Sequence, residues 1–139
     1  MSYSETITRT DLTNILNEVL PNTSVDYIVE QGTSGIWTYR KWNSGIAECW
    51  GTVSWSITSW SAWGSTYYST YSSQVDYPTG LFTSAPKRMT GNDLSNGDSW
   101  LGTQNNGTAS KTPKFFLMRG ANGSSGTGYV AVHAIGTWK

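Results

Sequence analysis

The clearest periodic pattern near the N-terminus is helical. Apolar side chains recur with the spacing of one helix face, at Leu12, Ile15, Leu16, Val19 and Leu20. Thr10 or Asp11 can cap the start of this helix, and Pro21 can end it. Because a helix of about three turns is marginal by itself, we expect its apolar stripe to dock on another surface.

A strict alternation of apolar and polar positions follows in residues 47–58, and it predicts a long strand. The face expected in the core holds Ala47, Cys49, Gly51, Val53, Trp55 and Ile57. The opposite face holds Glu48, Thr52, Ser54, Ser56 and Thr58. The turn residues 43–45 predict a hairpin to a preceding strand at 36–42, with Trp37 and Tyr39 on one face.

Further short strands are indicated between frequent turn signals. They cover residues 25–30, 81–83, 85–90, 99–103, 114–119 and 129–138, with turns at 32–35 and 91–98. Turn signals every 8–12 residues are typical of a sandwich or barrel. The predicted fold class is therefore all-β, a mainly antiparallel sandwich or barrel-like head, with one short N-terminal α-helix. We expect residues 1–23 to form the helix and a junction, and 24–139 to form the β-rich domain.

Composition excludes several classes of function. The 139 residues suit one domain, and nine basic residues balance nine acidic ones, which argues against nucleic acid as a partner. No run of apolar residues reaches the length of a membrane span, so no membrane insertion is expected. Residues 1–10 lack the basic and apolar regions of a signal peptide, and the expectation is synthesis in the cytoplasm without one.

The aromatic content, with 8 Trp and 8 Tyr among 139 residues, is the most informative feature. Aromatics without a clean period crowd into residues 60–71, where flat rings could stack on sugar rings and Ser and Thr could bind hydroxyl groups. The predicted receptor or carbohydrate site consists of Trp60, Trp63, Tyr67, Tyr68, Tyr71, Asn105 and Asn122. The alternative is that these rings pack against the sandwich or against another subunit. Rings in surplus of one small core also favour a homotrimer.

No convincing catalytic or metal-ligating set is present, so we expect no enzyme activity and no cofactor. Glu48 is expected to pair with Arg40 or Lys41 across the hairpin. His133 is the single histidine, and the polar residues 92–98 are typical of an ordinary turn. A metal ion at either place is the less favoured alternative. Cys49 is expected to be a small buried hydrophobe, not a reactive thiol.

Two strings resemble a known family. Residues 35–51, GIWTYRKWNSGIAECWG, and the ending VHAIGTWK at 132–139 resemble C-terminal modules of tail-fibre and minor structural proteins from phages of Gram-positive hosts. The predicted helix resembles one common in phage structural proteins. Members of that family carry the module at the end of a longer chain, so this chain is either a fragment or a small free-standing relative.

The resemblance implies a β-rich head at the distal end of a trimeric fibre on the virion. Such a head adsorbs to a polysaccharide or protein receptor on the host surface. The alternative within the virion is a purely structural part, such as a collar, baseplate or capsid-decoration protein. A cell-wall polysaccharide hydrolase is the less favoured alternative, because no convincing carboxylate pair is present.

Overall fold

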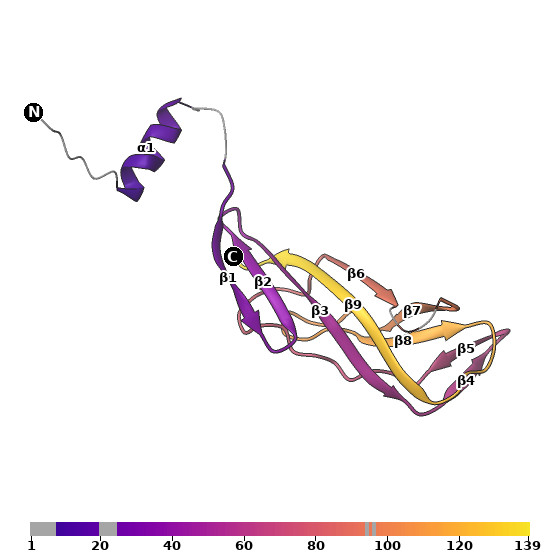
Figure 1. Ribbon diagram of the computed structural model, residues 1–139. Coiled ribbons are helices and arrows are strands. Elements are labelled where there is room, and N and C mark those ends of the chain that lie inside the picture. Colours follow the sequence, from indigo (N-terminus) through magenta and orange to yellow (C-terminus); the bar gives the residue numbers. More distant parts are fainter. Residues whose placement is uncertain (1–7, 20–24, 94, 96) are drawn as a thin grey trace, which may run out of the picture.

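The computed structural model describes residues 8–19, 25–93, 95 and 97–139. Within them the chain forms two antiparallel sheets and one helix (Figure 1). The helix α1 spans Arg9–Val19. The strands are β1 Ile28–Ser34, β2 Trp37–Trp42, β3 Ile46–Ile57, β4 Trp60–Trp63, β5 Thr66–Ser69, β6 Arg88–Asp93, β7 Ser99–Gln104, β8 Lys114–Arg119 and β9 Gly126–Thr137. One sheet has the order β1-β2-β3-β9-β6 and the other β4-β5-β8-β7. The predicted all-β sandwich with a single short helix is confirmed.

The helix begins slightly earlier than the capping signals suggested. Thr8 caps it: its hydroxyl accepts a hydrogen bond from the Asp11 backbone N–H at 3.1 Å, and Asp11 accepts from the Thr8 backbone N–H at 3.0 Å. The hydrogen bond from the Thr8 hydroxyl also lowers the pKa of the Asp11 carboxyl. Leu20 and Pro21, expected at the helix end, lie outside the described residues.

The long alternating segment forms β3, and its predicted facing is confirmed. Ala47, Cys49, Val53, Trp55 and Ile57 are all buried, whereas Thr52, Ser54 and Ser56 are exposed. The hairpin turn at residues 43–45 is also confirmed, with Gly45 at φ 96°. β3 pairs with β9 over twelve consecutive positions, from Ile46 opposite Thr137 to Ile57 opposite Gly126.

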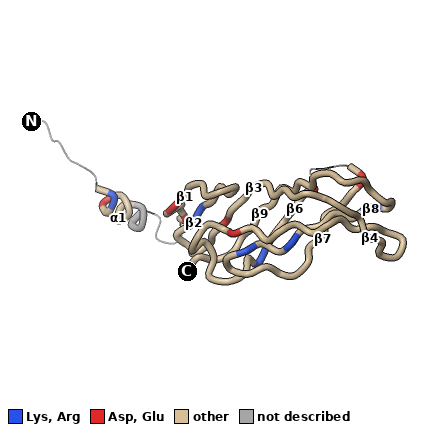
Figure 2. The backbone as a smooth tube through the Cα atoms, turned by 90° about the horizontal axis from the view of Figure 1, so that it is seen from below, with Lys and Arg blue, Asp and Glu red and all other residues tan. Residues whose placement is uncertain are grey.

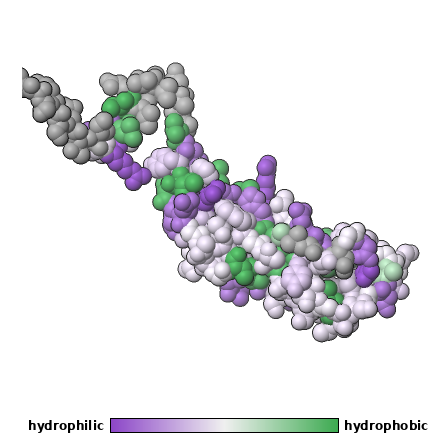
Figure 3. All heavy atoms as spheres, in the orientation of Figure 1, coloured by the Kyte–Doolittle hydropathy of each residue, from purple (hydrophilic) through white to green (hydrophobic). Residues whose placement is uncertain are grey.

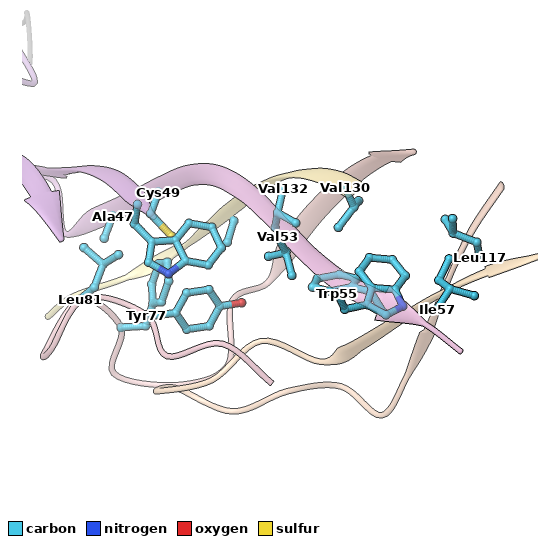
Figure 4. Packing of buried hydrophobic residues seen from close by; sticks show 14 residues of the cluster. Ala47, Cys49, Val53, Trp55, Ile57, Tyr77, Leu81, Leu117, Val130 and Val132 are labelled. Carbon is cyan, nitrogen blue, oxygen red and sulfur yellow. The ribbon is translucent and has the colours of Figure 1, made fainter. Parts of the chain in front are cut away.

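The core lies against the inner face of these two strands, as Figure 4 shows. At one end Leu117 of β8 lies near Ile57, so the second sheet covers this part of the first. At the other end Tyr77 and Leu81, which belong to no strand, lie below Ala47 and Cys49. Burial raises the pKa of the Cys49 thiol to about 12, in keeping with its expected role as a small hydrophobe.

The covering segment, residues 70–87, corrects one prediction. No strand forms at 81–83; Leu81 and Phe82 are consecutive residues that are both buried, whereas a strand at the edge of one core would bury only every second residue. The segment is held instead by indole donors and backbone bonds: Trp37 Nε1 donates to the Asp76 carbonyl at 2.7 Å and Trp55 Nε1 to the Thr70 carbonyl at 2.8 Å.

Other boundaries also moved. The strand expected at 25–30 begins only at Ile28 and runs to Ser34, and the side chains of this strand are nearly all exposed. The turn falls at residues 35–36, so the turn predicted at 32–35 was wrong. The strand expected at 85–90 begins only at Arg88 and runs on to Asp93. The strands expected at 99–103, 114–119 and 129–138 are confirmed, the last beginning three residues earlier.

The facing of β3 makes a test of the core. Trp55→Ala and Ile57→Ala should each lower the free energy of unfolding by roughly 2–5 kcal/mol, because each deletes a large buried side chain. The controls Thr52→Ala and Ser54→Ala change exposed positions of the same strand and should have effects within about 0.5 kcal/mol. Thermal or urea melts that rank the two pairs the other way would contradict the facing.

Candidate functional site

The aromatic segment 60–71 forms a hairpin, not the irregular segment that its spacing suggested. β4 and β5 are joined by a tight turn in which Gly64 adopts φ 60°, a left-handed conformation that suits glycine. The period was hidden because large rings occupy both faces of the hairpin. Trp60 and Tyr67 lie on the face of buried Ser69, and Trp63 and Tyr68 lie on the opposite, outer face.

Trp60 has a structural role. Its indole N–H donates to the Ser124 carbonyl at 2.9 Å, and the Arg119 guanidinium lies 5.4 Å from its ring centre. The Gly123 backbone packs so closely against the ring that a Cβ there would come within 2.5 Å of it. Trp60 is therefore committed to holding the segment between β8 and β9, and it is not on the outer face.

Three of the five predicted rings do come together. Trp63, Tyr68 and Tyr71 line a hollow of about 330 Å³ on the outer face of the second sheet. Residues that the sequence analysis did not single out complete this aromatic hollow: Thr103, Gln104 and Phe116. Phe116 alternates outward on β8 between buried Phe115 and Leu117, so strand parity was the available signal.

Ring contacts hold the floor of the aromatic hollow. The Tyr71 ring centre lies 5.2 Å from that of Phe116 at an interplanar angle of 79°, and the Tyr68 centre lies 5.7 Å from Tyr71. Trp63 is the exposed member, with 62% of its surface accessible, and Tyr71 is 37% accessible. The arrangement presents a free indole face beside a fixed aromatic cluster and the Gln104 amide, the combination that can stack on a sugar and bind its hydroxyl groups.

The two predicted asparagines do not line the hollow. Asn105 directly follows Gln104 at φ 66°, and its side-chain oxygen accepts a hydrogen bond from the Gly107 backbone N–H at 3.2 Å. Asn122 is exposed in the segment between β8 and β9, next to Gly123 under Trp60. Asn105 is thus at the border of the site, and Asn122 belongs to the Trp60 contact region.

Glu48 has a different partner from the one expected. Its carboxylate lies 2.9 Å from His133 Nε2 of β9, and Lys41 pairs with Glu30 at 2.9 Å. Arg40 is directly opposite Glu48 in the ladder, but its guanidinium lies over the Trp50 ring, 5.1 Å from the centre. The prediction was wrong because pairing of β3 with β9 brings in a side chain 85 residues away.

Two places in the sequence carry side chains that can ligate a metal, His133 and residues 92–98. Within the described residues, no group of three or more His, Cys, Asp or Glu side chains is close enough to hold an ion. Where a turn was predicted at 92–98, Asn92 and Asp93 belong to the end of β6, and Asp93 accepts a hydrogen bond from the Ser95 backbone N–H at 2.7 Å and another from the Ser99 hydroxyl. These are the local bonds of ordinary turn chemistry.

Comparison with known proteins adds no further assignment. No family model matches the chain, and neither a curated protein nor a solved structure matches it. Among the described residues, no helix combines the length and apolar character needed to cross a membrane.

The packing of Phe116 against Gly102, next to the aromatic hollow, can be tested by substitution. A Cβ at Gly102 of β7 would lie 2.4 Å from Phe116 Cζ, so Gly102→Ala should push the ring outward and lower the free energy of unfolding by about 1–3 kcal/mol. Gly126→Ala in β9 is the control, because nothing lies within 4 Å of a Cβ there. Equal melting temperatures for the two variants would contradict the close packing of Phe116 on Gly102.

Proposed function

We propose that the protein is an adhesion module, the receptor-binding head of a phage tail fibre, and that it recognises a glycan on the bacterial surface through the aromatic hollow. The observation that carries the proposal is the exposed Trp63 ring beside the fixed cluster of Tyr68, Tyr71 and Phe116. A tryptophan that is 62% accessible leaves most of its apolar surface in water and so contributes less to folding stability than a buried one. A ligand that covers it does gain apolar contact.

The chemistry of the surface favours a carbohydrate over a strongly charged partner. Charged residues are sparse along the chain, as Figure 2 shows, and they make up 13% of it. In the space-filling view of Figure 3 apolar residues form small separate patches on a surface of intermediate hydropathy. Uncharged polar groups beside aromatic rings suit neutral hydroxyl-rich ligands. The proposal includes no catalytic step.

The competing function is a purely structural role in the virion. In that case the exposed rings would be covered by a neighbouring subunit, which the same apolar surface could accommodate. Trp100 of β7 is a second exposed ring of the same sheet, 48% accessible, but it does not line the hollow. Comparing Trp63 with Trp100 therefore separates the two functions. Glycan binding requires the hollow, whereas a subunit interface has no need to distinguish the two tryptophans.

The decisive test is adsorption. Trp63→Ala should weaken binding to purified host wall polysaccharide roughly fivefold per site, the loss of about 1 kcal/mol of stacking. On whole cells the loss should be larger, because several weak sites act together. The melting temperature should stay close to that of the wild type, because Trp63 is mostly exposed.

Trp100→Ala is the matched control, an exposed tryptophan of the same sheet outside the hollow. It should leave adsorption unchanged. Equal losses in both variants, or no binding of the wild-type protein to any wall fraction, would favour the structural role.

We further propose that the head is a homotrimer. On α1 the apolar side chains Leu12 and Ile15, three residues apart and so on one face, are 52% and 47% accessible in a single chain. Burying such a face against equivalent helices would stabilise a helix that is short by itself. Light scattering at micromolar concentration should give three times the chain mass of 15.3 kDa. A monomeric mass would contradict the assembly.

A further inference from the structure

A second concave site lies on the outer face of the other sheet. There β2, β3, β9 and β6 lie side by side and border an open cleft of about 510 Å³. It is lined by Arg40, Glu48, Trp50, Gly51, Thr52, Thr90, Asn92, Ala131, Val132 and His133. We call this the polar cleft. None of its residues lines the aromatic hollow.

The ring of Trp50 organises one end of the polar cleft. The Arg40 guanidinium lies 5.1 Å from its centre, and the His133 ring meets it edge-on at 6.2 Å and 89°. His133 is in turn bound to Glu48 at 2.9 Å. Stacking on an aromatic ring holds a guanidinium in place while leaving its N–H groups free to point outward.

The charge arrangement leaves Arg40 available. Glu48, the acidic residue of the cleft, is paired with His133. Among the described residues, Arg40 forms no ion pair. A held guanidinium with free N–H groups matches a carboxylate or a phosphate, which it can bind through two parallel hydrogen bonds.

Neutral polar groups line the cleft on both sides of β9. Thr90 of β6 is opposite His133, and Asn92 of β6 and Thr52 of β3 are both opposite Ala131. Neighbouring strands are about 4.8 Å apart, and same-face residues along a strand about 6.8 Å. Because β9 lies between β3 and β6, Thr52 and Asn92 are two strand spacings, about 9.6 Å, apart. Two hydroxyl groups and an amide on the two sides of β9 can donate to and accept from the hydroxyl groups of a sugar that lies between them.

We propose that the polar cleft binds an acidic sugar, with its carboxylate or phosphate on Arg40 and its hydroxyl groups on Thr52, Thr90 and Asn92. This site goes beyond the aromatic hollow and does not depend on it. Together with the aromatic hollow of the proposed function, the cleft would give the protein two separate saccharide sites, one for an apolar sugar face and one for an anionic group.

Three hexoses that differ in one group test the cleft: glucose, glucuronate and glucose 6-phosphate. Each is titrated into the intact protein while the Trp50 indole N–H signal is followed by NMR. At least one of the two acids should give a saturable shift, and glucose should bind at least about tenfold more weakly. The two acids separate a carboxylate site from a phosphate site. Equal binding of glucose, or no saturable shift with either acid, would overturn the proposal.

Variants then locate the contact. Arg40→Gln should lower the affinity for the acid at least about tenfold. Arg88→Gln is the matched control, because Arg88 lies on β6 two positions before Thr90, outside the lining, and its loss changes the net charge equally. Equal losses in both variants would indicate only bulk charge attraction and overturn the site.

Two further measurements keep the outcome clear. Arg40→Gln could disturb the fold, which the near-UV circular dichroism spectrum would reveal. In that case Asn92→Ala, which changes an exposed position, is the test of the site: it should weaken binding of the acid, and unchanged binding would overturn the proposal. Trp63→Ala should leave binding of the acid intact. Failure of the polar cleft is therefore separate from failure of the aromatic hollow.

Discussion

The twelve-position ladder between β3 and β9 is the interaction on which the rest of the structure depends. Both strands alternate buried and exposed residues along their length, so their pairing fixes one inner face and one outer face at once. The inner face collects Val53, Val130 and Val132 into the core. The outer face carries Trp50 and His133, so the ladder that builds the core also builds the polar cleft.

One end of that inner face is covered by residues that belong to no strand, and the polar groups around this covering segment are paired. Buried hydroxyl groups take over the role of a ladder: Ser69, Ser72 and Thr112 accept hydrogen bonds from the backbone N–H groups of Leu117, Phe115 and Val75 at 3.0, 2.8 and 3.0 Å. Indole N–H groups bind its carbonyls. Buried backbone groups must be paired, and here the abundant Ser, Thr and Trp residues do it.

The two outer faces of the sandwich differ in chemistry because their strands do. The second sheet places rings outward, and Gly102, which has no Cβ, lets the Phe116 ring come close to the neighbouring strand. The first sheet places hydroxyl, amide and charged groups around one tryptophan. A small domain with few charges thereby presents an apolar and a polar concave surface, and the side chains proposed to bind ligands in both lie outside the core cluster.

The sequence by itself determined the elements whose pattern is local: the helix, β3 with its facing, β8 and the hairpin turn before Gly45. The sequence also predicted that Trp63, Tyr68 and Tyr71 share a surface, and the structure brings these three rings to one hollow. It did not predict that Trp60 and Tyr67 lie on the opposite face of the hairpin. Only the tertiary structure decided which residues distant in the sequence contact each other. The Glu48–His133 pair, the hollow completed by Gln104 and Phe116, and the burial of Leu81 and Phe82 all depend on which strands and segments become neighbours. Periodicity reports which way a residue faces, whereas its partners are chosen by long-range pairing that no local pattern encodes.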